Sequence, residues 1–195
     1  MTRPDIWAQT KSGRAVDLLR PDPATIDFGD IAWHLAHINR YAGATRRPVS
    51  VAYHTLMGLT FCDESLAPYW LIHDAHEAYT GEIPSPMKRA LAAGGGAGVG
   101  LIESALDGAI CAAAGLPVEG MIAARESVAR IDLRCLVTER RDFLSCSPRP
   151  WGAPIEAATP DHEIWRGDEW GVSPSDVAGS LARAFRRHLP ALRTS

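Results

Sequence analysis

Two neighbouring residues, His73 and Asp74, place an imidazole nitrogen and a carboxylate oxygen at one point of the chain. Zinc, manganese, cobalt, nickel and iron all accept these two types of ligand. Adjacent side chains on a helix diverge by about 100°, but the longer histidine can still reach an ion that the aspartate holds. Because such a pair also occurs by chance, and a histidine on a half-apolar helix is often a core residue, the pair alone leaves both interpretations open.

Two further polar residues lie in apolar stretches, where each needs a partner. His54 falls within one predicted helix, and Asp132 lies beside the apolar stripe of another. A carboxylate is rarely buried without a cation or a hydrogen-bond network. A salt bridge from Asp132 to Arg130 or Arg134 is the alternative, although residues two apart face different sides of a helix. We therefore predict one divalent metal ion (Zn, Co, Mn, Ni or Fe, or Mg). Its predicted ligands are His54, His73, Asp74 and Asp132.

A third carboxylate near the pair suggests acid–base chemistry. Glu77 follows His73 by four residues and so shares its helix face. From there it could hold or activate a water molecule at the metal. We therefore predict Glu77 and Asp74 as the catalytic residues.

Residues before His54 are candidates for further contacts. His34 and His37 are spaced i, i+3 and could form a second metal site; alternatively, one packs and the other faces solvent. Arg40, Arg46 and Arg47 precede His54 in the sequence. Clustered arginines usually face solvent, but these lie shortly before the first predicted metal ligand, so at least one of them could bind phosphate. Trp33 could stack on a base or belong to the core. The candidate substrate contacts in this part of the chain are Trp33, Arg40, Arg46 and Arg47.

Helical periodicity recurs along the chain, and we predict an all-α, globular orthogonal bundle with a possible short hairpin before Asp30, around Ser12-Gly13. One domain spans 1–195, with its core at about 30–145 and a C-terminal helix at about 175–189 packing on it. Helices are expected from the N-cap Asp30 to near Gly43, after the cap Ser50, from Pro68 to Gly81, after 84–86, from Leu101 to Ala114, from Glu119 to Leu144 and after the cap Ser175.

The composition of the chain limits the classes of partner and the cellular location that we expect. The net charge of −3 argues against a surface for duplex nucleic acid. The N-terminus lacks the pattern of a signal peptide, and no apolar run approaches the ~20 residues of a membrane span, so we expect a cytoplasmic protein without a membrane partner. The glycine-rich stretch 94–100 fits neither common nucleotide-binding motif and is interpreted as a loop between helices.

The order of the predicted ligands on successive helical segments resembles that of the HD-domain phosphohydrolase superfamily. The similarity spans roughly Ser12 to Phe143, and it is closest to YfbR-like 5'-deoxynucleotidases and phage-type dATP triphosphohydrolases. One departure is Glu82, where many relatives have aspartate. The strings that carry the resemblance are Ser50–His54, Leu71–Tyr79, Gly81–Pro86 with Lys88, and Ile131–Asp132 with Thr138–Asp142.

This resemblance implies a metal-dependent enzyme that removes phosphate from small nucleotides, with 2'-deoxynucleotides as the expected substrates. It implies that Glu77 orients or deprotonates the nucleophile, that Lys88 neutralises phosphate charge, and that the protein forms a homo-oligomer. Three other interpretations stay open: an HD protein that senses a nucleotide without hydrolysing it, a cyclic-nucleotide phosphodiesterase, and a helical interaction protein without a metal.

Overall fold

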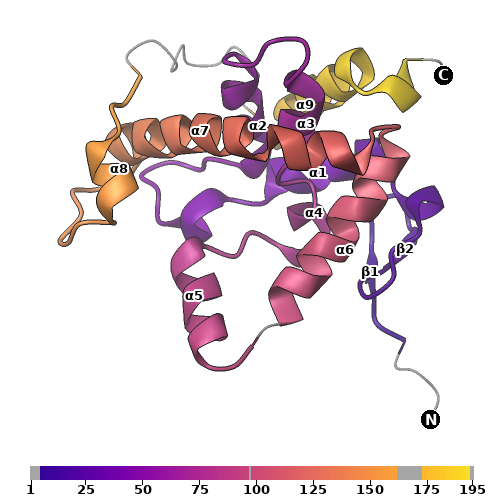
Figure 1. Ribbon diagram of the computed structural model, residues 1–195, viewed down its shortest axis with the longest axis horizontal. Coiled ribbons are helices and arrows are strands. Elements are labelled where there is room, and N and C mark those ends of the chain that lie inside the picture. Colours follow the sequence, from indigo (N-terminus) through magenta and orange to yellow (C-terminus); the bar gives the residue numbers. More distant parts are fainter. Residues whose placement is uncertain (1–4, 97, 162–172, 194–195) are drawn as a thin grey trace.

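Helices carry most of the chain, and the strands among the described residues form one short hairpin near the N-terminus (Figure 1). The computed structural model describes residues 5–96, 98–161 and 173–193. The hairpin pairs β1 (Trp7–Gln9) with antiparallel β2 (Ala15–Asp17), and Ala8 lies opposite Val16. Gly13 has a φ of +87° in its turn, a conformation that glycine adopts without steric cost. The predicted all-α fold with a short N-terminal hairpin is confirmed.

The first helix, α1 (Phe28–His37), begins and ends earlier than the sequence suggests. Asp27 is the N-cap, because its carboxylate accepts hydrogen bonds from the backbone of Gly29 and Asp30. The prediction of Asp30 as the cap was wrong, since its carboxylate accepts from the backbone and hydroxyl of Ser12 in the hairpin turn. Beyond α1 the chain forms a 3₁₀ turn (Arg40–Gly43) instead of continuing the helix.

The predicted helix from Pro68 to Gly81 is two short helices, α3 (Ala67–Ile72) and α4 (Glu77–Thr80), joined by a turn that contains His73 and Asp74. The ring Nδ1 of His73 donates to the carbonyl of Trp70 at 2.6 Å. This carbonyl would otherwise accept from the backbone of residue 74 in a regular helix. The preceding helix, α2 (Val51–Leu59), begins as predicted, with Ser50 as its cap.

Three of the remaining helices follow the predicted order: α5 (Ser85–Ala93), α6 (Gly98–Ala113) and α7 (Val118–Phe143). A short helix that was not predicted, α8 (Ala153–Ala157), precedes the predicted last helix, α9 (Pro174–His188). The cap of α9 is Ser173 rather than Ser175, because Ser173 forms a reciprocal capping box with Asp176. The stretch 94–100 is only partly a loop, since Gly98 already begins α6; residue 97 lies outside the described part.

Two apolar clusters hold the helices together. In the larger one, α1 packs along α9, and the rings of Phe28 and Phe185 meet edge to face at 5.2 Å. The smaller cluster joins α2, α3 and α7 through Met57, Trp70, Ile131 and Cys135. Because these three helices supply or adjoin the predicted metal ligands, the second cluster fixes the position of the candidate site.

Within the described residues, no individual helix combines the length and apolar composition needed to cross a membrane. Helices α6 and α7 are joined by a bend of 114°. Only when they are taken together do they satisfy these criteria, by length and composition alone.

Candidate metal centre

The structure brings three of the predicted ligands, His54, His73 and Asp74, within 4.8 Å of one another, and the fourth, Asp132, lies against His54. His54 comes from α2, His73 and Asp74 from the turn after α3, and Asp132 from α7. The Nε2 atom of His54 lies 3.3 Å from Asp132 Oδ1 and 3.7 Å from Asp74 Oδ2. The Nε2 atom of His73 lies 3.1 Å from Asp74 Oδ2. Two imidazole nitrogens and two carboxylates therefore converge from segments far apart in the sequence.

The hydrogen bonds of both histidines direct the same ring nitrogen toward the centre. His54 Nδ1 donates to Glu139 at 2.9 Å, and His73 Nδ1 donates to the carbonyl of Trp70. In the neutral rings, both Nε2 atoms therefore carry lone pairs. Both Nε2 atoms are buried and lack a hydrogen-bond partner. This donor set fits a divalent transition metal, which imidazole nitrogen and carboxylate oxygen bind in proteins.

The alternative salt bridges of Asp132 are not the ones that form. Arg130 pairs with Glu126 at 3.2 Å, and Arg134 pairs with Asp161. The carboxylate of Asp132 instead faces His54, and it is the most exposed of the four candidate ligands.

The charges at the centre depend strongly on one another. Burial and Arg40 act to lower the pKa of His54, but the carboxylates of Glu139 and Asp132 raise it above its ordinary value. Burial opposes ionisation of Asp74, but His73 lowers its pKa well below the usual range. The pKa of Asp132 is also lowered, against burial, mainly by His54. The centre thus keeps its carboxylates ionised and available to a cation.

The pKa of Glu77 is shifted in the opposite direction to those of Asp74 and Asp132. Glu77 is buried at the start of α4, and its Oε2 atom has no hydrogen-bond partner. Burial, followed by the charge of Asp74, raises the pKa of Glu77 to about 9. Without a metal ion, Glu77 is therefore protonated at neutral pH, and strongly shifted carboxyl groups of this kind are concentrated at functional sites.

Sequence reasoning missed the role of Glu139, which is fully buried on α7. Its carboxylate accepts from His54 Nδ1, from Arg40 Nε at 2.9 Å and from the Tyr41 hydroxyl at 2.5 Å. Burial acts against ionisation, but Arg40 and His54 lower the pKa of Glu139. A signal was present in the sequence: Glu139 follows Asp132 by seven residues, two helical turns, and therefore lies on the same face of the helix.

The predicted substrate contacts on the arginine run separate into two groups. Arg40 lies at the centre, buried, with Nη1 3.8 Å from Asp74 Oδ2. Arg46 instead donates to the carbonyl of Asp142 at the end of α7, and the guanidinium of Arg47 lies 4.7 Å from the centroid of the Phe143 ring.

Lys88 and Trp33 have partners of their own. Lys88 Nζ forms an ion pair with Glu103 of α6 at 2.9 Å. Trp33 stacks on His37 at 4.4 Å between ring centroids, and Lys11 Nζ lies 4.1 Å from the ring of Trp33.

The two early histidines are not arranged as a second metal site. His34 Nδ1 donates to the carbonyl of Ala78, and its Nε2 accepts from the backbone of Lys11. Both ring nitrogens of His34 are thus engaged, while His37 Nδ1 bonds the carbonyl of Trp33.

A backbone turn next to Arg40 holds the carboxylate of Glu82. Tyr41 and Ala42 adopt left-handed conformations, with φ of +58° and +49°. Their backbone amides point at the two carboxylate oxygens of Glu82, at 3.4 and 3.3 Å. Left-handed backbone is costly for residues other than glycine and is concentrated at functional sites.

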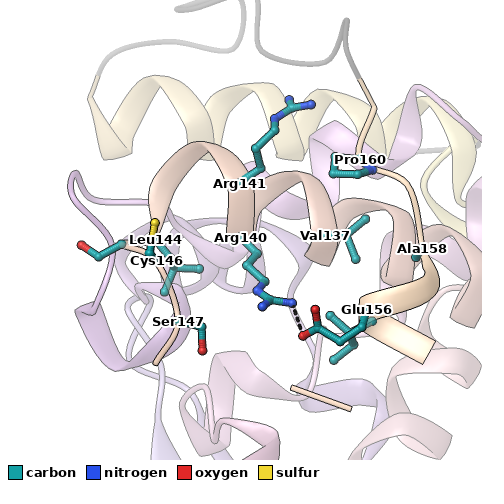
Figure 2. A pocket seen from close by; sticks show the side chains of 11 residues that line it. Val137, Arg140, Arg141, Leu144, Cys146, Ser147, Glu156, Ala158 and Pro160 are labelled. Atoms are coloured by element: carbon teal, nitrogen blue, oxygen red, sulfur yellow. Dashed lines mark hydrogen bonds and ion pairs between the residues drawn. The ribbon is translucent and has the colours of Figure 1, made fainter. Parts of the chain in front are cut away.

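A surface pocket of about 440 Å³ lies at the end of α7 and contains none of the predicted site residues. Figure 2 shows Arg140 reaching into it to pair with Glu156, at 2.7 Å. Arg140 directly follows Glu139, so neighbouring positions of α7 serve two different places: the buried centre and this pocket.

No protein-family model matches the chain. It is 35% identical over 137 residues to the uncharacterized protein YfdR of Escherichia coli (strain K12), covering 70% of this chain and 72% of YfdR. It is also 35% identical over 97 residues to the uncharacterized protein RCAP_rcc00048 of Rhodobacter capsulatus, covering 45% of this chain and half of that protein. At this identity and coverage, the chain belongs to the same family as YfdR.

Proposed function

We propose that this protein is a cytoplasmic, metal-dependent nucleotide phosphohydrolase of the HD-domain type, acting on 2'-deoxynucleotides. The observation that carries the proposal is the pair of buried, unpartnered Nε2 atoms of His54 and His73, directed toward the carboxylates of Asp74 and Asp132. A buried polar atom without a partner is costly, so such a pair is expected where a ligand completes it.

The side chains around the centre fit hydrolysis of a phosphate ester or anhydride. A bound divalent ion would polarise the phosphoryl oxygen and lower the pKa of water. Glu77, buried near Asp74, would orient or deprotonate the attacking water once the positive charge of a bound ion lowers its pKa. Arg40 Nη1 lies 3.8 Å from Asp74 Oδ2, where it would face a phosphate oxygen. The preference for deoxyribose rests on resemblance alone.

The test is a substrate screen on protein purified without chelator. Deoxy- and ribonucleoside mono-, di- and triphosphates are incubated with Co²⁺, Mn²⁺, Mg²⁺ or Zn²⁺, and released phosphate, pyrophosphate and triphosphate are measured. We expect metal-dependent release from deoxynucleotides, abolished in His73→Ala. Stoichiometric metal without any release from these substrates would contradict the enzyme and leave a metal-binding protein. Equal rates on ribo- and deoxynucleotides would remove only the sugar preference.

We also expect the protein to form a homo-oligomer, and sedimentation velocity can measure its oligomeric state in solution.

A further inference from the structure

Glu139 is connected to two different functional groups of the centre. Its carboxylate lies on α7, fully buried, and is reached by His54 from α2 and by Arg40 and Tyr41 from the turn that follows α1. We propose that Glu139 is a positioning residue that fixes both His54 and Arg40 for the metal-dependent activity. This inference rests on the proposed function and adds a residue to its machinery.

The chemistry of the three partners requires a carboxylate at this position. The three groups that reach Glu139 all donate: a ring N–H, a guanidinium N–H and a phenolic O–H. One oxygen of Glu139 serves His54, and the other serves Arg40 and Tyr41. Glutamine has one accepting oxygen and one donating nitrogen, so it can satisfy only one side. An uncharged side chain of the same size would therefore leave either the ring or the guanidinium without an acceptor.

For His54, the contact sets which nitrogen faces the centre. Since Glu139 accepts from Nδ1, the lone pair of the neutral ring is on Nε2, which lies 3.3 Å from Asp132 Oδ1. A carboxylate on the far nitrogen also increases the basicity of a ligating histidine and fixes its ring plane. His73 obtains the same orientation from the backbone carbonyl of Trp70. The orientation of His54 depends instead on a side chain, which a substitution can remove.

For Arg40, the same carboxylate anchors one end of the guanidinium. The Nε atom bonds Glu139 at 2.9 Å, while Nη1 lies 3.8 Å from Asp74 Oδ2. The planar guanidinium cannot rotate freely once Nε is held, so its terminal nitrogens are directed toward the centre. Glu139 also balances the positive charge of Arg40, which would otherwise lie uncompensated beside a cation site.

The competing explanation is that Glu139 only ties the turn 40–43 to α7. Buried ion pairs contribute little net stability compared with apolar residues of similar volume, so stability alone is a weak reason for this network. A purely structural role would lower the stability of every form of the protein. A positioning role would in addition change how a metal binds, which can be measured without any turnover.

The experiment compares Co²⁺ binding by chelator-treated wild type, Glu139→Gln, Tyr41→Phe and Asp30→Asn. Affinity is measured by competition with a chromophoric chelator, and geometry by the visible absorption of bound Co²⁺. Asp30→Asn is the matched control, because Asp30 is also a buried carboxylate with side-chain and backbone donors, but its partner Ser12 belongs to the hairpin.

We expect Glu139→Gln to bind Co²⁺ about 10–100-fold more weakly, with an altered absorption spectrum, as is typical when the partner of a ligating histidine is lost. Tyr41→Phe, which removes one of the three donors, should weaken binding by about 2–10-fold. Asp30→Asn should lose stability but keep wild-type affinity. At saturating Co²⁺, a remaining rise in KM of Glu139→Gln for a nucleotide reports on Arg40.

The possible failures are distinct. Wild-type protein that does not bind Co²⁺ would overturn the metal centre and this inference with it. Wild-type affinity and spectrum in Glu139→Gln would overturn the inference alone, and an unchanged KM would overturn its Arg40 part. Should Glu139→Gln not fold, Tyr41→Phe carries the test, since Tyr41 is only half-buried, and unchanged affinity there overturns the proposal.

Discussion

At the scale of single residues, substitutions of Glu77 and of His73 should have different effects. The Nε2 atom of His73 lies near Asp74, whereas Glu77 is a buried carboxyl group whose pKa is raised by burial and by the charge of Asp74. We expect Glu77→Gln to keep near-stoichiometric metal and to lose about 10²–10⁴ in kcat, the usual effect of an acid–base residue. His73→Ala should lose both metal and rate. Metal analysis and kcat of both variants test this, and full activity in Glu77→Gln removes the assigned role.

The same glutamate should make the metal-free protein less stable as pH rises. The folded state keeps the Glu77 proton up to a pKa of about 9, whereas the unfolded chain releases it near 4.5. Between these values the folded state binds more protons than the unfolded state, so this group's contribution to stability falls as pH increases. Glu77→Gln removes the ionisable group and should stabilise metal-free protein by about 1–3 kcal/mol at pH 8, the usual cost of an unsatisfied buried group.

Urea unfolding of chelator-treated protein at pH 5.5 and pH 8 checks this. The difference between Glu77→Gln and wild type should grow with pH; a difference that is constant or that shrinks would contradict it.

Residue types and order were sufficient to predict that His54, His73 and Asp74 lie close together with Asp132 beside His54, because buried histidine and aspartate require partners that only a few chemistries supply. Their role as metal ligands stays a prediction. Residue types and order were not sufficient to predict Glu139 and Tyr41. Their roles depend on the turn 40–43 meeting α7, about 100 positions later in the chain, and no local pattern encodes that meeting. For the same reason Arg40, Arg46 and Arg47 looked equivalent in sequence, although the structure places only Arg40 at the centre.

At the scale of elements, helix existence was predictable and helix ends were less so. The apolar periodicity of α2 and α7 is visible in the sequence, and Ser50 was correctly predicted as a cap. The break between α3 and α4 was not predicted. In this turn the backbone bonds residues three positions apart, and the ring of His73 also bonds the carbonyl of Trp70, contacts that apolar periodicity does not encode.

Close packing of α2 on α3 is what holds Trp70 under the centre. A Cβ atom added to Gly58 would lie 1.9 Å from the Trp70 ring, which is fully buried and stacked on His73 at 4.0 Å. The ring cannot move without disturbing His73. We therefore expect Gly58→Ala to destabilise the protein by about 1–3 kcal/mol or more, as overpacking does, and to weaken metal binding.

Gly108→Ala is the matched control. Gly108 lies inside α6, and a Cβ atom there would meet nothing within 4 Å. Alanine is the better helix former, so this variant should gain up to about 1 kcal/mol. Thermal and urea unfolding of the two variants measure both effects, and equal stability of the two would contradict the packing argument.

At the scale of the whole molecule, the candidate ligands join parts of the chain that are otherwise held by one small apolar cluster. His54, Asp74 and Asp132 come from α2, the α3–α4 turn and α7, which meet through Met57, Trp70, Ile131 and Cys135. An ion bound by these residues would bridge segments nearly 80 positions apart in the sequence. The unfolded chain cannot present them together, so a metal should bind the folded state preferentially.

Metal binding should therefore raise the melting temperature of the whole protein. A ligand at 100 times its Kd stabilises the folded state by about 2.7 kcal/mol, and 1 kcal/mol corresponds to about 2–4 °C for a chain of this size. We expect chelator-treated wild type to gain roughly 5–10 °C on adding saturating Co²⁺ or Mn²⁺. Differential scanning calorimetry measures the shift, and excess chelator should reverse it.

The decisive comparison uses variants that remove one ligand and leave the rest of the fold. Asp132→Asn changes the most exposed of the four ligands, so the metal-free protein should melt close to metal-free wild type. The increase on adding metal should nevertheless shrink by more than half, because α7 loses its link to the other two segments. Asp142→Asn, also on α7 but paired with its neighbour Arg141 at the surface, should keep the full increase. An equal gain in wild type and Asp132→Asn would mean that the ion binds elsewhere, and no gain in wild type at any metal concentration would mean that the convergence of these side chains serves another purpose.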